Sequence, residues 1–216
     1  MKLLILRPRP GAGETAARAR ALGLEPVVAP LFAIEALSWE PPTGVFDAVL
    51  LTSANAARLG GDAMTPYLGL LCYAVGESTA KAARDAGFAA VRTGPADGAA
   101  LATLARAEGM GRLLHLCGRD HIALDGVVSV PVYVAEPAGD LPPDAEDMLV
   151  LLHSPRAAAR LASLAGDRRK HMRIAAISAQ AGNAVGEGWH SLAIAEAPRD
   201  EALLELAAKL CQTADR

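Results

Sequence analysis

Serine and threonine residues follow several of the short apolar runs in this sequence, at positions where they could cap helices. Serine and threonine are favoured N-cap residues. A capped helix start also offers free backbone N–H groups and the positive end of the helix dipole, which together suit a carboxylate or a phosphate. The residues concerned are Ser53, Ser78, Thr79, Ser154 and Ser178. The sequence therefore predicts several anion-binding helix starts at the carboxyl ends of strands, where α/β sheets generally bind ligands.

Patterns for other kinds of chemistry are weaker. Ser53 and Ser154 lack the GxSxG context of a nucleophilic serine. The five histidines show no HExxH or paired spacing, so no metal site is expected. His115 lies within an apolar run and fits a hydrogen-bonded core residue, whereas His121 and His153 lie at strand ends and could face a cleft.

The segment from Gly11 to Ala16 has the outline of a dinucleotide-binding fingerprint, because it reads Gly-Ala-Gly-Glu-Thr-Ala between an apolar run and a helical pattern. Two prolines separate the first apolar run from Gly11, and no acidic residue ends the next apolar run, which closes at Pro30. Such an acidic residue would bind the ribose of the dinucleotide. A turn and a helix start explain the segment better, and no cofactor is expected.

Composition narrows the class of protein. The chain has 216 residues, 52% of them hydrophobic, which favours two domains of about 100 residues each. The net charge is -3, and Lys and Arg are scattered, so we expect neither nucleic acid nor an anionic membrane as a partner. Three widely spaced cysteines fit a reducing cytoplasm. The N-terminal apolar run is too short for a signal peptide, and no run approaches the about 18 residues of a membrane span.

The sequence contains an internal duplication. Val49–Ala57 reads VLLTSANAA, and 101 residues later Val150–Ala158 reads VLLHSPRAA. The register continues from residues 74–76 to 176–178, and a fainter similarity links the first apolar run to the run that precedes Cys117 and Gly118. The repeats cover about 1 to 108 and 112 to 209, which indicates two related halves.

Short apolar runs alternate with Ala-rich helical patterns, which is typical of βαβ units around a parallel sheet. We predict strands at 3–6, 47–52, 71–75, 112–117, 148–153 and 173–178. We predict helices at 13–22, 54–60, 78–87, 98–108, 155–165, 180–188 and 199–211. The predicted N-caps are Ser53, Ser78 or Thr79, and Ser154, whose neighbour Pro155 is a favoured first helical residue.

Two further β-rich runs contain a central proline, Pro30 in one and Pro131 in the other. Proline is tolerated on edge strands but not in the middle of a sheet, so these runs are expected at a margin or between domains. Two linkers imply that the chain enters the second domain, completes it and returns to the first. The predicted domains are 1–33 with 137–216, and 40–128, joined by linker strands at about 30–37 and 129–136.

With these segments placed, the whole chain resembles the uroporphyrinogen-III synthase family. The resemblance depends on an ordered set of short motifs. They are Leu-Arg7-Pro8, Leu-Thr52-Ser53-Ala-Asn55, Ala74-Val-Gly76-Glu-Ser-Thr79-Ala80, Val132-Tyr133, Ser154-Pro155 and Ala176-Ile177. It implies two α/β domains joined by a two-stranded linker with a cleft between them. It also implies a monomeric cytoplasmic lyase of heme biosynthesis that needs no metal or organic cofactor.

The reaction implied by the resemblance is closure of the linear tetrapyrrole hydroxymethylbilane, with loss of water and inversion of ring D, to give uroporphyrinogen III. Spontaneous closure gives the uninverted isomer, so such an enzyme must chiefly impose geometry on its substrate. The alternative is a non-enzymatic two-domain α/β protein that binds a small anionic ligand.

The resemblance suggests a set of site residues. Tyr133 is the candidate catalytic residue, which would hydrogen-bond to the departing hydroxyl, although packing of a linker aromatic would also explain it. The carboxylates of the substrate would be bound by helix starts and arginines. The candidate substrate-binding residues are Arg7, Ser53, Gly76, Ser78, Thr79, Gly118, Arg119, Ser154, Arg156 and Gln180. Gln180 stands where the family often has a threonine, so its amide would replace a hydroxyl contact.

Overall fold

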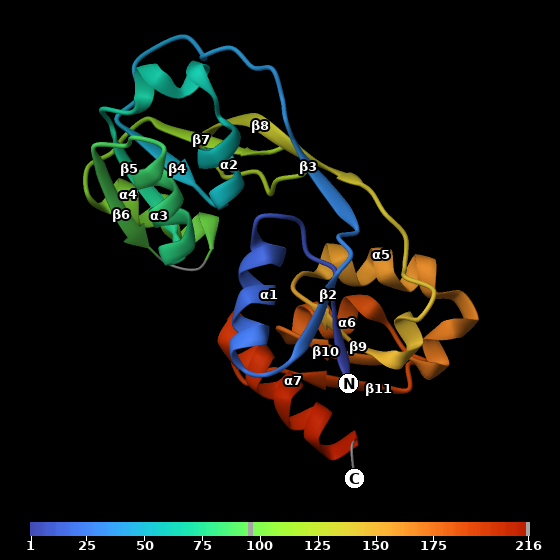
Figure 1. Cartoon of the computed structure of the whole chain (residues 1–216). Coiled ribbons are helices and arrows are strands. Elements are labelled where there is room, and N and C mark those ends of the chain that lie inside the picture. Colours follow the sequence, from blue (N-terminus) through green and yellow to red (C-terminus); the bar gives the residue numbers. More distant parts are fainter. Residues whose placement is uncertain (95–96, 215–216) are drawn as a thin grey trace. The chain divides into compact units, whose positions relative to one another are not determined.

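A computed structural model of the chain describes residues 1–94 and 97–214. The chain forms two compact units, coloured along the sequence in Figure 1. Unit 1 comprises Met1–Ala33 and Pro137–Arg216, and unit 2 comprises Ile34–Glu136. The chain therefore leaves unit 1, completes unit 2 and returns, so that unit 1 contains both ends of the sequence.

Unit 1 is a parallel sheet covered by helices on both faces. Its strands are β1 (Lys2–Ile5), β2 (Glu25–Val28), β9 (Met148–Leu152), β10 (Arg173–Ala176) and β11 (Ser191–Ile194). Its helices are α1 (Gly11–Ala21), α5 (Pro155–Ala165), α6 (Ala179–Val185) and α7 (Asp200–Ala214), with 3-10 turns at Ala145–Asp147 and Gly166–His171. The strand order is β11-β10-β9-β1-β2, and every pair in it is parallel.

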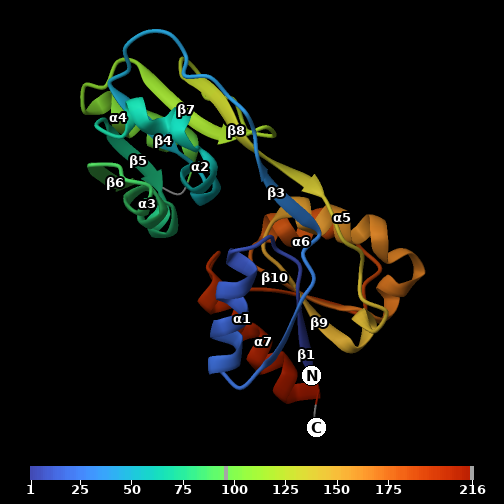
Figure 2. The same cartoon turned by 45° about the horizontal axis from the view of Figure 1, so that its top comes forward.

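Unit 2 repeats this plan. Its strands are β3 (Phe32–Ala36), β4 (Ala48–Leu51), β5 (Leu71–Val75), β6 (Ala90–Gly94), β7 (Leu113–Gly118) and β8 (Val128–Pro137), with β3 and β8 each crossing the unit boundary. Its helices are α2 (Ala54–Leu59), α3 (Gly76–Asp85) and α4 (Gly98–Ala107), with a 3-10 helix at Asp62–Tyr67. The strand order is β3-β8-β7-β4-β5-β6. Figure 2 shows the helices of this unit lying against its sheet.

The two sheets are topologically equivalent. Read from one edge, β11-β10-β9-β1-β2 of unit 1 corresponds to β6-β5-β4-β7-β8 of unit 2. The equivalent helices are α5 and α2, α6 and α3, and α7 and α4. The helix α1 has no counterpart, because β7 and β8 are joined by the loop 119–127 where β1 and β2 are joined by α1.

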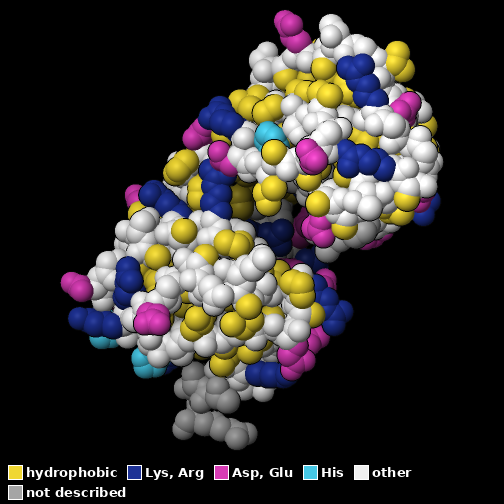
Figure 3. Space-filling model, turned by 180° about the vertical axis from the view of Figure 1, so that it is seen from behind, with side chains coloured by type: hydrophobic (Ala, Val, Ile, Leu, Met, Phe, Trp, Pro, Cys, Tyr) yellow, Lys and Arg dark blue, Asp and Glu magenta, His cyan; other side chains and the backbone are white. Residues whose placement is uncertain are grey.

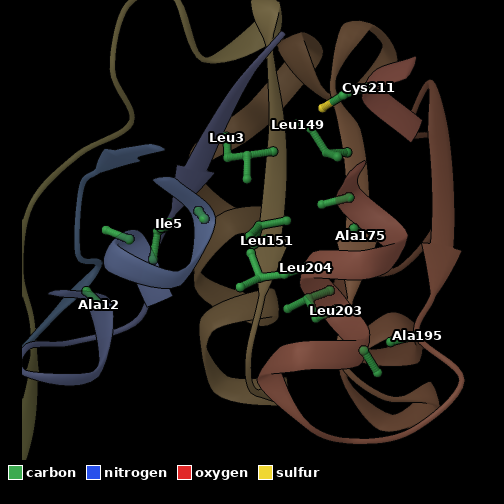
Figure 4. Close-up of a cluster of buried hydrophobic side chains, with 14 residues drawn as sticks. Leu3, Ile5, Ala12, Leu149, Leu151, Ala175, Ala195, Leu203, Leu204 and Cys211 are labelled. Atoms are coloured by element: carbon green, nitrogen blue, oxygen red, sulfur yellow. The ribbon is translucent and has the colours of Figure 1, made fainter. Parts of the chain in front are cut away.

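The cores explain why these sequences fold as layers. In unit 1, Leu3 and Ile5 of β1 pack with Leu149 and Leu151 of β9 against α1 and α7, as Figure 4 shows. Small alanines of α1 let its backbone approach the sheet closely. In unit 2, α2 and α3 cover one face of the sheet and α4 covers the other. The alternation of short apolar strands with Ala-rich helices thus fills both sides of each sheet.

The predicted α/β fold is confirmed, and so are the predicted strands and helices, to within a few residues at their ends. Gly11 and Gly13 both lie in α1, which supports the interpretation of the segment as a turn and helix start. The sequence did not predict β6 or β11, which lie at the far edges of the two sheets. Most of their side chains are exposed, so neither strand has a long apolar run.

The prediction that Ser78 or Thr79 caps a helix is wrong. The helix α3 begins at Gly76, directly after β5, and no side chain caps it. Gly76 adopts a φ of 70°, which turns the chain out of the strand without a polar cap. By contrast, Ser53 and Ser154 cap α2 and α5 as predicted.

The proline-bearing runs were expected at a sheet margin or between domains, and each meets one of these alternatives: the first includes an edge strand, and β8 crosses the boundary between the units. Pro30 follows β2, which is an edge strand of its sheet. Pro131 lies in β8, which is flanked by β3 and β7 and is therefore not an edge strand. The register between β7 and β8 shifts after Cys117, which pairs with Pro131, so that Gly118 pairs with Tyr133. A bulge of this kind accommodates a proline within a sheet because one ladder position is skipped.

Candidate active site

Unit 2 contains a cavity of about 530 Å³ at the carboxyl ends of its central strands. Thr52 and Ser53 follow β4, His115 and Gly118 lie on β7, and Tyr133 lies on β8. The start of α4 and residues 120–125 form the remaining wall. This is the sheet edge where parallel α/β proteins bind ligands.

The cavity exists where unit 2 lacks a helix. In unit 1, α1 follows β1 and packs beside α7 over the sheet. In unit 2, the equivalent strand β7 is followed by the loop 119–127, and α4 is the counterpart of α7. The duplication therefore produces one unit in which this position is filled by a helix and one in which it is open to a ligand.

Gly118 positions the ring of Tyr133 in the cavity wall. A Cβ atom added at Gly118 would lie 2.8 Å from Cζ and 3.0 Å from the hydroxyl oxygen of Tyr133. The backbone N–H of Arg119 donates to the carbonyl of Tyr133 at 2.9 Å, which holds the two strands together at this point. Only glycine allows the phenol to lie this close to β7, so the two residues form one structural feature.

His121 anchors the loop that borders the cavity. Its Nδ1–H donates to the carbonyl oxygen of Gly118 at 3.0 Å. Because a carbonyl only accepts, this bond places a proton on Nδ1. The rings of His121 and His115 lie edge to face, 5.9 Å apart. Next to this anchor, Ile122 is 87% exposed at the cavity rim, which is unusual for a large apolar side chain.

His115 lies beneath the cavity and is almost completely buried. Its Nε2 lies 2.9 Å from Oγ1 of Thr52, and its Nδ1 lies 3.3 Å from Oγ of Ser129. Burial, together with the nearby His121, lowers the pKa of His115 to about 4, so the ring is neutral at physiological pH. The expectation of a hydrogen-bonded core histidine is correct, and the same residue also borders the cavity.

The lining of the cavity is more acidic than the substrate-binding hypothesis anticipates. Asp97, Asp120 and Asp125 line it, and its described lining residues include neither lysine nor arginine. Arg119 pairs with Glu136 at 2.8 Å. The cavity is therefore better suited to an uncharged or cationic group than to a carboxylate. On the face that Figure 3 shows, basic side chains lie singly or in small groups among acidic ones.

Other predicted site residues of unit 2 lie outside this cavity. Gly76, Ser78 and Thr79 form the first turn of α3, which follows β5. Thr79 is 6% exposed, so its side chain packs inside the unit. Ser53 lines the cavity, and its hydroxyl accepts from the backbone N–H of Asn55 at 3.2 Å.

The remaining predicted site residues belong to unit 1. Ser154 caps α5 by accepting from the N–H of Ala157, and the guanidinium of Arg156 lies 4.7 Å from the ring centre of Phe32. Gln180 is exposed in the first turn of α6. Arg7 donates to Thr15 at 3.3 Å. The structure thus brings Ser53, Gly118 and Tyr133 together at one cavity and distributes the other candidates over both units.

Unit 1 has a polar cluster at the edge equivalent to the cavity. Asp200 accepts from His153 Nε2 at 2.9 Å, from the Thr15 hydroxyl at 2.9 Å and from Arg18 at 2.6 Å. Arg7 lies 3.7 Å from the same carboxylate. His153 therefore does not line the unit 2 cavity, and its Nε2 is bonded to Asp200 within unit 1.

The expectation that His121 faces a cleft is confirmed, because His121 lines the cavity. Sequence reasoning missed Asp97, Asp120 and residues 122–125 as cavity residues, and it treated His115 as core alone. The available signal was the repeat itself, because the second half has no helical pattern between residues 118 and 128. Across the described parts of the chain, no group of three or more His, Cys, Asp or Glu side chains could hold a metal ion. Among the described helices, none is long and apolar enough to cross a membrane.

Two equivalent α/β units, one of which has a ligand-sized cavity at its strand ends, define a duplicated α/β protein that acts on a small molecule. The family model described as "Uroporphyrinogen-III synthase HemD" matches residues 13–205. The chain belongs to the uroporphyrinogen-III synthase family. It is a cyclising hydro-lyase of heme biosynthesis that converts hydroxymethylbilane to uroporphyrinogen III. This result favours the enzyme over the non-enzymatic binder.

Solved structures agree on the fold. Uroporphyrinogen-III synthetase from Helicobacter pylori 26695 is 17% identical, with a TM-score of 0.65 over 97% of this chain and 100% of that one. A mutant uroporphyrinogen III synthase from the extremely thermophilic bacterium Thermus thermophilus is 18% identical, with a TM-score of 0.52 over 99% of this chain and 100% of that one. No curated protein sequence matches significantly. At these identities the structural likeness shows the fold, and the family match carries the function.

Proposed function

We propose that ring closure takes place at the cavity of unit 2, with Tyr133 as the residue that acts on the departing hydroxyl. The observation that carries this proposal is the fit between Gly118 and Tyr133, which holds the phenol in the cavity wall. A rigidly held hydroxyl suits an enzyme whose main task is to orient a flexible substrate.

In the proposed step, the bond between the hydroxymethyl carbon and its oxygen breaks, and the hydroxyl leaves with one proton as water. The Tyr133 O–H donates a hydrogen bond to the leaving oxygen. The electron pair of the pyrrole nitrogen stabilises the carbocation that remains. The ring D carbon that carries the methylene bridge to ring C then forms the new carbon–carbon bond, which gives a spiro intermediate. The older bond from that carbon to the bridge breaks and leaves a cation on the bridge carbon, which the ring C nitrogen stabilises. The other α-carbon of ring D bonds to the bridge carbon and loses its proton, so that ring D is inverted and one water is released overall.

The charge of the cavity supports this assignment. Positive charge develops on the pyrrole ring as the hydroxyl departs, and Asp97, Asp120 and Asp125 line the cavity. Fixed charges placed where opposite charge develops stabilise a transition state. We therefore place the reacting end of the substrate in this cavity and its carboxylate arms outside it.

We further propose that the substrate carboxylates contact the other predicted residues. In unit 2 these are Gly76, Ser78 and Arg119, with Thr79 contributing its backbone N–H because its side chain is buried. In unit 1 they are Arg7, Ser154, Arg156 and Gln180. The first turns of α3 and α5 offer backbone N–H groups to an anion. The chain is proposed to act as a cytoplasmic monomer. Its three cysteines are buried and form no disulfide with one another, which fits a reducing compartment.

The experiment is an isomer assay with freshly prepared hydroxymethylbilane, followed by oxidation and separation of isomers I and III. We expect Tyr133→Phe and Gly118→Ala each to slow formation of isomer III about tenfold, since each removes or displaces one hydrogen-bond donor. Tyr67→Phe is the matched control, because Tyr67 is a buried tyrosine of the same unit outside the cavity. Wild-type rates in both cavity variants would contradict the proposed site.

A further inference from the structure

His115 contacts a second hydroxyl of the cavity wall, that of Thr52. Thr52 directly follows β4, and His115 lies on the adjacent parallel strand β7, where it pairs with Leu50. Nε2 of His115 lies 2.9 Å from Oγ1 of Thr52, while Ser129 on the neighbouring strand β8 contacts Nδ1. The buried ring is therefore held from both sides and cannot turn away from Thr52.

The Thr52 side chain is fixed on its other side as well. A Cβ atom added at Gly98, the first residue of α4, would lie 3.1 Å from Cγ2 of Thr52. The methyl group of Thr52 thus packs against the start of α4 while its hydroxyl meets His115. Two contacts on opposite sides select one rotamer of Thr52, which lines the cavity.

The duplication provides an internal comparison. Thr52 occupies the position of His153, and Gly98 occupies that of Asp200. In unit 1 these two positions bond to each other, with Thr15 of α1 donating to the same carboxylate. In unit 1, His153 and Asp200 therefore bond to each other inside the unit. In unit 2, Thr52 lines a cavity, and its hydrogen-bond partner is the buried His115.

We propose that His115 is a positioning residue, which fixes the Thr52 hydroxyl so that its oxygen accepts a hydrogen bond from a pyrrole N–H of the substrate. This inference rests on the proposed location of the active site. The hydroxyl has two acceptor lone pairs and one hydrogen. Whether His115 donates to Thr52 or accepts from it, at least one lone pair remains for the substrate.

The experiment measures kcat/KM for isomer III in a double-mutant cycle of His115→Leu and Thr52→Val. Each single variant is expected to lose about tenfold, and the double variant no more than either one, because both remove the same interaction. His115→Gln keeps an amide near the position of Nε2 and should regain most of the activity. His115→Asn reaches only the position of Nδ1 and should not. The control His171→Leu removes an exposed histidine of unit 1.

The outcomes separate the inference from the proposed site. A loss in Thr52→Val with wild-type kcat/KM in His115→Leu overturns the inference alone. Losses that multiply in the double variant also overturn it, since His115 would then act independently of Thr52. Wild-type kcat/KM in Thr52→Val, together with wild-type kcat/KM in Tyr133→Phe, overturns both the inference and the proposed site. Urea unfolding of each variant verifies that the measured protein is folded.

Discussion

Asp200 is predicted to stabilise unit 1 by joining segments from both ends of the sequence. Its carboxylate lies at the start of α7 and is bonded to Thr15 and Arg18 of α1 and to His153 after β9. The side chain is 10% exposed. The substitution Asp200→Ala removes the acceptor that these donors share.

The expected cost follows from burial. Removing one partner of a buried charge pair costs about 3–5 kcal/mol, because the other charge is left uncompensated. The Arg7 and Arg18 side chains are 33% and 46% exposed, so both can turn toward water. We therefore expect the lower end of the range, about 3 kcal/mol, for Asp200→Ala. Asp200→Asn keeps one acceptor oxygen and should cost about half as much.

The assay is urea unfolding monitored by circular dichroism at pH 7. Asp144→Ala is the matched control, since Asp144 pairs with Lys2 of the same unit at 3.8 Å and both side chains are about half exposed. An exposed pair of this kind should change the free energy of unfolding by less than about 1 kcal/mol.

The pH dependence gives a second measurement. Burial opposes ionisation of Asp200, but hydrogen bonds from His153, Thr15 and Arg18 outweigh it and hold the pKa well below its usual range. A depressed pKa stabilises the fold above the unfolded value of about 3.9, and this stabilisation is lost as the pH falls toward the folded value. The difference between wild type and Asp200→Ala should therefore shrink by about 1 kcal/mol between pH 4 and pH 3. Two results would refute the reasoning. One is a wild-type free energy of unfolding that exceeds that of Asp200→Ala by less than about 1 kcal/mol at pH 7. The other is a difference between the two proteins that is the same at pH 4 and pH 3.

Three further predictions concern stability. Because the pKa of His115 falls from 6.5 to about 4 on folding, wild type should lose about 3 kcal/mol as the pH drops between these values. His115→Leu should flatten that part of the urea-derived profile, and an unchanged slope would contradict the assignment. Ser154→Ala removes the cap of α5 and should cost about 1 kcal/mol in urea unfolding, whereas the exposed Ser163→Ala should cost little. Gly139 has a φ of 66°, and a Cβ there would lie 2.6 Å from the Pro30 carbonyl oxygen. Gly139→Ala should therefore lower the melting temperature by several degrees, and an unchanged value would count against the close approach.

Much of the fold could be predicted because its signals are local. Apolar runs such as Val49–Leu51 mark buried parallel strands, and serine caps such as Ser154 mark helix starts. The helix start at Gly76 was missed because a positive φ, rather than a side-chain cap, turns the chain there. The position of Pro131 in an inner strand was not predicted, because a bulge in the pairing with β7 is not visible in the sequence of β8 alone.

The sequence by itself determined the duplication, the α/β class and, through its ordered motifs, the family to which the chain belongs. It also identified Tyr133 and Gly118, because both lie in segments that resemble that family. Only the tertiary structure showed that these two residues touch, and that the loop 119–127 leaves a cavity where unit 1 has a helix. The contact between Thr52 and His115 likewise joins residues 63 positions apart. Contacts of this kind depend on which strands become neighbours in the sheet, and that is a property of the folded chain rather than of any local sequence.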